Sequence, residues 1–80
     1  MTVGERVRAV VAQTFNIPVE AVDDATTPAA VAAWDSLGQL ALVNALEQEF
    51  AIEFVLEDIA RMNSVREIRS IVETRDAVHH

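Results

Sequence analysis

The stretch from residue 36 to residue 50, SLGQLALVNALEQEF, is the part of the sequence that most constrains the fold. Its large apolar residues recur at three- and four-residue intervals, which is the period of an α-helix with one apolar face. Asp35 or Ser36 can cap its start by accepting a hydrogen bond from a free backbone N–H of the first turn. The spacing predicts a helix over 36–50. Its inward stripe comprises Leu37, Leu40, Val43, Leu46 and Phe50, with Leu42 beside it.

Two other segments show the same periodicity behind their own start signals. Thr2 and Glu5 form the pair of a capping box before a helix that ends near residue 16, and Ser64 and Glu67 form another before the last helix. A short helix fits 56–61, and a long connection over 17–34 is pinned by Ile17, Val22, Val31 and Trp34. The fold class predicted is all-α, a four-helix bundle of three longer helices and a short third helix, with a long loop between helices one and two.

Length and composition indicate one domain that no disulfide or metal ion stabilises. We expect residues 1–76 to form the helical domain and residues 77–80 to form a disordered C-terminal tail. The sequence has no cysteine, and its two histidines are residues 79 and 80, so neither a disulfide framework nor a metal site is predicted. No run of 18 apolar residues occurs, which argues against a membrane span. We expect a monomeric cytoplasmic protein.

Charge is distributed unevenly along the chain. The formal net charge is -7, every basic residue is an arginine, and none lies between Arg8 and Arg61. A surface with one sign of charge repels nucleic acid and anionic lipid and attracts basic patches on proteins. The alternative interpretation is a solvated surface that keeps a small protein soluble.

Ser36 is the residue with the clearest chemical potential. At a helix start its hydroxyl is reachable, and an anionic group attached there lies in the favourable field of the helix N-terminus. An enzyme is not indicated, because the sequence has no lysine and no internal histidine to activate the serine. We therefore expect another enzyme to modify Ser36. Gly38 has two interpretations: a residue tolerated near a fraying end, or clearance for a group that approaches the serine closely.

The residues Asp35-Ser36-Leu37, together with ALEQEF at 45–50, resemble the phosphopantetheine attachment region of acyl carrier proteins, and the similarity extends over nearly the whole chain. The resemblance implies a four-helix bundle in which Ser36, flanked by Asp35 and Leu37, carries 4'-phosphopantetheine. A phosphopantetheinyl transferase would attach this group from coenzyme A, and its thiol would carry acyl groups as thioesters.

The resemblance also implies a docking face and a cargo pocket. Enzymes that transfer or modify acyl groups would dock basic patches on the helix that bears Ser36. The predicted docking residues are Asp35, Leu37, Gln39, Leu42, Asn44, Glu47 and Glu49. The predicted acyl-chain pocket is Leu42, Leu46, Ile59, Met62, Val65 and Ile68. In the alternative, Phe54 and Leu56 fill this seam and keep the cargo outside.

Departures from the family pattern bear on the pathway. Gly38, Ala41 and Asn44 stand where fatty-acid carriers usually show an acid, an acid and a methionine, and Val55-Leu56 replaces a usual proline and aspartate. These differences favour a specialised stand-alone carrier for a polyketide, lipid or other dedicated acyl pathway over the housekeeping fatty-acid carrier. The predicted function is to carry acyl intermediates for a fatty-acid, polyketide or other lipid biosynthetic pathway. An amino-acyl or peptidyl carrier, and an unmodified helical adaptor of the same fold, remain open alternatives.

Overall fold

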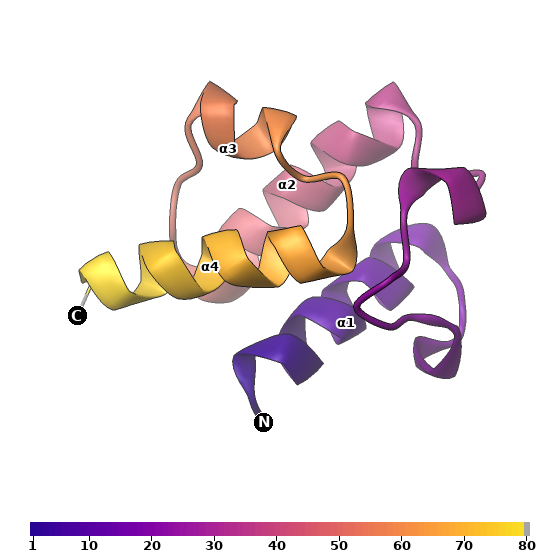
Figure 1. Ribbon diagram of the computed structural model, residues 1–80, viewed down its shortest axis with the longest axis horizontal. Helices are drawn as coiled ribbons and strands as arrows, with labels where there is room; N and C mark the ends of the chain where they lie inside the picture. The colour runs from indigo at the N-terminus through magenta and orange to yellow at the C-terminus, as the bar shows by residue number, and fades with distance from the viewer. Residues whose placement is uncertain (80) are drawn as a thin grey trace.

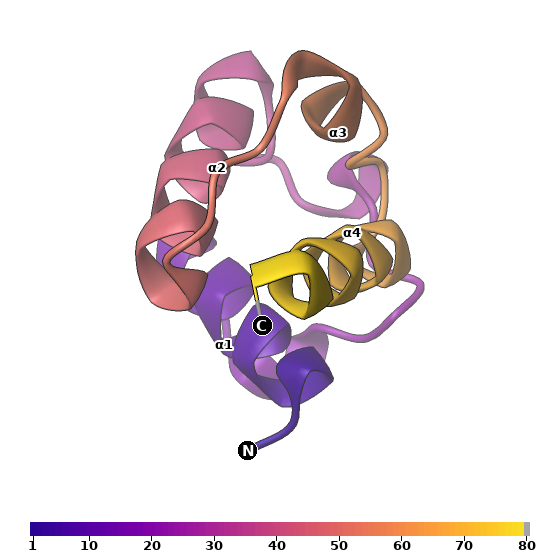
Figure 2. The ribbon, with the colours of Figure 1, turned by 90° about the vertical axis from the view of Figure 1, so that its left-hand side faces the viewer.

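A computed structural model describes the backbone of residues 1–79 and the side chains of residues 1–75. Within this part the chain forms four α-helices and no strand, which confirms the predicted fold class. Helix α1 packs against both α2 and α4, while α3 and the first turn of α2 lie at the end of the molecule away from the N-terminus (Figures 1 and 2). The helices are α1 (Val3–Phe15), α2 (Ser36–Phe50), α3 (Leu56–Ala60) and α4 (Val65–His79), and single 3₁₀ turns occur at Val19–Ala21 and Pro28–Ala30.

Local signals set the ends of α1 as predicted. Thr2 Oγ1 accepts a hydrogen bond from the Glu5 N–H at 3.1 Å, and Glu5 Oε1 accepts one from the Thr2 N–H at 3.0 Å, so the capping box is present. The bond from the Thr2 backbone, which favours the ionised carboxylate, is the main reason that the pKa of Glu5 lies below its ordinary value of 4.5. At the other end Asn16 adopts a left-handed conformation with φ 55°, and Pro18 prevents the helix from continuing.

Helix α4 begins at the predicted cap and runs further than expected. Ser64 Oγ accepts a hydrogen bond from the Glu67 N–H at 3.1 Å. The backbone is helical as far as His79, because no glycine or proline follows Ser64 to interrupt it. The helix therefore covers most of the segment for which the sequence predicts a disordered tail, and His80 lies outside the described residues.

The core lies between α1, α2 and α4. The residues buried there show that the predicted inward stripe of α2 was wrong at Leu37 and Leu40. Leu37 and Leu40 are 78% and 58% exposed, and the inward residue of the first turns is instead the half-buried Gln39. At 100° per residue, position 39 faces the same side as positions 42, 43, 46 and 50, whereas 37 and 40 face outward. The most deeply buried large side chains are Val7, Val11, Val22, Leu42, Leu46, Met62, Val65, Ile68 and Val72.

The long connection between α1 and α2 is anchored at both ends. Val22, Val31 and Trp34 are buried as predicted, and Ile17 is half-buried. The stretch between the two 3₁₀ turns is tied to the start of α4, because backbone carbonyls at 24 and 26 accept hydrogen bonds from the N–H groups of 66 and 65. An ion pair of 2.8 Å between Asp24 and Arg69 adds to this attachment.

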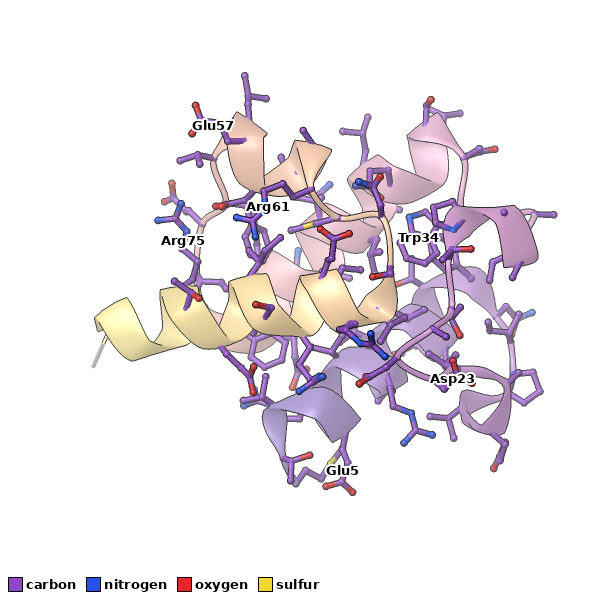
Figure 3. The ribbon with its side chains drawn as sticks, in the orientation of Figure 1. Glu5, Asp23, Trp34, Glu57, Arg61 and Arg75 are labelled. Carbon is purple, nitrogen blue, oxygen red and sulfur yellow. The ribbon has the colours of Figure 1, made fainter. Side chains whose placement is uncertain are left out.

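Helix α3 has only five residues and depends on a buried acid for its position. Asp58 is 9% exposed and accepts hydrogen bonds from the Val55 N–H at 3.2 Å and from Arg75 Nε at 2.9 Å. Figure 3 shows Arg75 reaching from α4 toward α3, and its Nη2 lies 2.7 Å from the same carboxylate oxygen. None of the described helices is long and apolar enough to cross a membrane.

Candidate functional site

Ser36 is the first residue of α2 and is exposed. The residue that caps the helix is Asp35, whose extended backbone precedes the first turn and whose Oδ1 accepts a hydrogen bond from the Gly38 N–H at 2.8 Å. The sequence left the cap open between Asp35 and Ser36, and the structure assigns it to Asp35. The Ser36 hydroxyl is therefore not needed for capping and stays available at the helix end.

Gly38 leaves room for the protein's own backbone. A Cβ at this position would lie 2.0 Å from the Ala33 carbonyl oxygen and 3.0 Å from a ring carbon of Phe15. Neither interpretation offered by the sequence is therefore needed. The close approach is that of the connection immediately before the helix, so Gly38 fixes where residues 33–35 enter α2 and thereby where Ser36 is displayed.

Trp34, in the loop before α2, joins that loop to α1 and α2 directly beside Ser36. Its ring is buried and stacks on Phe15 with centroids 5.6 Å apart and an interplanar angle of 27°. Its Nε1 donates a hydrogen bond to Gln39 Oε1 at 2.6 Å, and Gln39 Nε2 donates to the Ile59 carbonyl at 3.1 Å. Figure 3 shows Trp34 between the connection and the first part of α2. Gln39 thus joins Trp34 to α3, a structural role that the sequence analysis missed.

An open groove of about 510 Å³ begins at Ser36 and extends toward α3. Of the predicted pocket residues, Ile59 and Met62 line this groove, whereas Leu42, Leu46, Val65 and Ile68 lie in the closed core. A groove of about 580 Å³ along α1 does not include Ser36. The groove at Ser36 is lined by Pro28, Trp34, Asp35, Ser36, Gln39, Ile59, Ala60, Met62 and Asn63.

The predicted docking contacts need corrections at Leu42 and at Gln39. Gln39 faces inward and is bonded to Trp34 and Ile59, so it is not part of the outer face of α2. Leu37 and Asn44 are exposed, but Leu42 has no exposed surface, because it faces the core from the inward side of α2. Leu42 therefore cannot contact a partner in this fold. Leu40, which the sequence placed in the inward stripe, is the exposed leucine one turn from Ser36.

The two predicted docking acids of α2 already have intramolecular partners. Glu49 forms an ion pair of 3.0 Å with Arg6, whose guanidinium also lies 4.4 Å above the centre of the Phe50 ring. Glu47 Oε2 accepts a hydrogen bond from the Phe54 N–H at 3.0 Å and so holds the loop before α3. Part of the acidic character of α2 thus serves the fold, and no local sequence signal identifies these distant partners.

The arrangement displays a hydroxyl without the means to activate it. The sequence supplies no lysine and no histidine before residue 79, and within the described residues no group of three metal-binding side chains occurs. An anionic ester on Ser36 fits the site, because it would lie at the N-terminus of a 15-residue helix beside a groove with a partly apolar floor. The Asn63 side chain in the groove wall provides a polar contact for an amide-containing chain, whereas the Gln39 amide is already bonded to Trp34 and Ile59.

Comparisons with known proteins agree with this arrangement. The family described as "Phosphopantetheine attachment site" matches residues 5–72. The solution structure of a holo acyl carrier protein from Geobacter metallireducens has the same fold, with a TM-score of 0.87 over 99% of this chain and 91% of that chain, at 23% identity. The comparison with curated protein sequences finds no match.

The family match covers most of the chain. It includes the starts of α2, α3 and α4, and with them the displayed Ser36. In this family the group that fits the site is a covalently attached 4'-phosphopantetheine, which another enzyme supplies. The chain therefore belongs to the phosphopantetheine attachment site family and is a carrier protein, modified by a phosphopantetheinyl transferase, rather than an enzyme.

Proposed function

We propose that Ser36 is the attachment residue. The observation that carries this proposal is the position of Ser36 as the exposed first residue of α2, with the cap supplied by Asp35. The other two serines are less suitable. Ser64 is engaged in capping α4, and Ser70 lies in the middle of α4 rather than at a helix end. Asp35 and Leu37 flank the serine and are exposed, so they are positioned to contact the transferase.

Intact mass after incubation with coenzyme A and a broad-specificity phosphopantetheinyl transferase tests the assignment. The wild type is expected to gain the mass of one phosphopantetheinyl group, and Ser36→Ala is expected to gain nothing while its helical circular dichroism stays unchanged. Ser70→Ala is the matched control, because it removes an exposed hydroxyl of the same chain, and it should be modified like the wild type. A mass gain that persists in Ser36→Ala would refute the proposal.

The proposed function is transport of acyl intermediates for a dedicated fatty-acid, polyketide or other lipid biosynthetic pathway. When bound, the phosphopantetheine supplies a terminal thiol that holds acyl groups as thioesters. The chain's own contribution is the groove beside Ser36, where the apolar side chains of Ile59 and Met62 favour an aliphatic cargo over a charged amino-acyl one. Met62 belongs to the same buried cluster as Leu42, Leu46, Val65 and Ile68, so an acyl chain would reach those residues only by opening this cluster.

The alternative in which Phe54 and Leu56 close the seam receives little support. Leu56 is 84% exposed, and Phe54 is half-buried against the core. Loading with acyl groups of increasing length and following the methyl resonance of Met62 tests the proposal. A shift that grows with chain length is expected, whereas changes confined to Ser36 and its neighbours at every length would contradict the role of the groove.

We also propose that partner enzymes dock on the outer face of α2. Leu37 and Leu40 provide apolar contact next to Ser36, and the carboxylates of Asp35 and Glu47 provide negative charge. Glu49 contributes less, because Arg6 already pairs with its carboxylate. Electrostatic attraction acts mostly on the encounter rate and is screened by salt. The transferase rate is therefore expected to fall as ionic strength rises above the physiological value, and a rate independent of salt would exclude this charge assignment.

A pair of matched substitutions separates the apolar part of the interface from general effects. Leu40→Ala should lower the transferase rate several-fold, because a central apolar contact is removed. Val19→Ala truncates another exposed apolar side chain, in the 3₁₀ turn at Val19–Ala21 rather than in α2, and should leave the rate unchanged. Equal effects of the two substitutions would contradict docking through the outer face of α2.

A further inference from the structure

Gln39 is an amide at an inward position of an otherwise apolar helix face. It shares that face with Leu42, Val43 and Leu46, and its side chain is half-buried. Such a position is stable only when both ends of the amide have partners. Here the oxygen accepts from Trp34 Nε1 at 2.6 Å and the nitrogen donates to the Ile59 carbonyl at 3.1 Å.

These two bonds join residues that line the groove at Ser36. Trp34, Gln39 and Ile59 all line it, so the amide runs from the connection before α2 to the last turn of α3 directly beside Ser36. Met62 belongs to the same buried cluster as Leu42 and Leu46, and Ile59 packs against that cluster. A chain moving from Ser36 into this interior must pass between α2 and α3.

Helix α3 is the element that can open. It has five residues. Side-chain bonds hold it at its first turn through the Asp58–Arg75 pair, and at its last turn through the bonds from Gln39 to the Ile59 carbonyl and from Asn63 to the Ala60 carbonyl. A helix this short has little stability of its own. The bond from Gln39 therefore controls the end of α3 that lies nearest to Ser36.

We propose that Gln39 determines how readily acyl cargo enters the interior of the protein. The proposal rests on the proposed function, in which Ser36 bears the cargo. While the bond to Ile59 is intact, α3 stays against α2 and short acyl chains remain in the open groove. Opening breaks the bond from the Gln39 amide to the Ile59 carbonyl. The carbonyl keeps its bond from the Met62 N–H, but the amide nitrogen loses its partner inside an apolar seam, and only a longer chain repays this loss by burying more methylene groups.

Gln39→Glu tests the bond with little change in shape. A carboxylate can still accept a hydrogen bond from Trp34 but cannot donate one to the Ile59 carbonyl, so the bond that holds α3 is lost. Gln48→Glu is the matched control, because it makes the same change on an exposed position of the same helix. Gln39→Met, which keeps the length of the side chain and removes both bonds, serves as the second variant if Gln39→Glu fails to fold.

The first measurement uses the unloaded protein. Native-state hydrogen exchange at the N–H groups of Ile59 and Met62, which bond within and just after α3, reports the opening of this helix. Loss of one hydrogen bond is expected to raise the exchange rate about three- to ten-fold in Gln39→Glu. Gln48→Glu should match the wild type. Unchanged exchange in both Gln39 variants would overturn the proposal.

The second measurement uses protein loaded with four-, eight- and twelve-carbon acyl groups. Cleavage of the thioester by hydroxylamine is slow when the chain is inside. In Gln39→Glu, cleavage of the eight-carbon thioester is expected to be about three- to ten-fold slower than in the wild type, because opening is easier. Equal rates in Gln39→Glu, Gln48→Glu and the wild type would refute the role of Gln39. Failure to load any of the proteins would instead refute the assignment of Ser36. The hydrogen-exchange data would still test whether the bond from Gln39 to Ile59 holds α3.

Discussion

Gly38→Ala is expected to destabilise the protein although alanine is the better helix former. The new Cβ would lie 2.0 Å from the Ala33 carbonyl oxygen, whereas real Cβ atoms stay at least 3.0 Å from such atoms, so one backbone segment must move by about 1 Å. Because the new Cβ meets backbone rather than a flexible side chain, the overpacking cost lies in the upper part of the usual range, at about 2–3 kcal/mol, and the helix propensity of alanine returns only about 1 kcal/mol. We expect a net loss of about 1–2 kcal/mol.

Thermal unfolding followed by far-ultraviolet circular dichroism measures this loss. For a domain of this size, about 1–2 kcal/mol corresponds to a fall in Tm of roughly 5–15 °C. Gly4→Ala, in the first turn of α1, is the control, because its Cβ would meet side-chain atoms and no backbone, the nearest being a flexible side-chain carbon of Arg69 at 3.0 Å. That variant should change the stability by less than about 1 kcal/mol. A Gly38→Ala protein as stable as Gly4→Ala would refute the argument that Ala33 requires the glycine.

The other expected outcomes concern burial and pH. Leu42→Ala should lower the free energy of unfolding by about 2–5 kcal/mol, because the side chain is fully buried. Leu40→Ala, at an exposed position, should change it by less than about 0.5 kcal/mol. Denaturant unfolding measures both changes, and similar losses would contradict the assigned orientation of α2. The pKa of Glu5 is lowered by the Thr2 backbone N–H, so its ionised form stabilises the fold above its ordinary pKa of 4.5, and this stabilisation is lost as pH falls through the lower folded value. Glu5→Gln should therefore be less stable than the wild type at neutral pH, and the difference should shrink below pH 4.5; a difference independent of pH would exclude the capping carboxylate as its source.

The helices could be predicted from the sequence because their signals are local. The capping box of Thr2 and Glu5, the break at Pro18 and the apolar period of 36–50 lie within a few residues of the elements that they define. The same holds for Ser36, whose place at the start of a helix follows from its neighbours. A helix start needs no knowledge of the rest of the fold.

The side of α2 that faces inward could not be predicted in the same way. Leu37 and Leu40 look like core residues, and Gln39 looks like a surface residue, until Trp34 and Ile59 supply partners for the amide. The Ile59 carbonyl is 20 residues away in sequence. A buried polar residue is recognisable only when the groups that satisfy it are in place.

The role of Glu49 on the predicted docking face could not be predicted for the same reason, because its partner is distant in the sequence. Glu49 pairs with Arg6, which is 43 residues away, and so belongs partly to the contact between α1 and α2. Charge counted along the sequence is therefore an upper bound on the charge that a partner meets.

The position of Trp34 gives this carrier a built-in optical signal. The sequence has one tryptophan and no tyrosine, so ultraviolet emission excited at the red edge of the absorption band comes from a single indole. That indole is stacked on Phe15 and hydrogen-bonded next to the first turn of α2, where its emission wavelength and lifetime depend on local polarity. Spectroscopy of the unlabelled protein should therefore report, in real time, on events at the start of this helix.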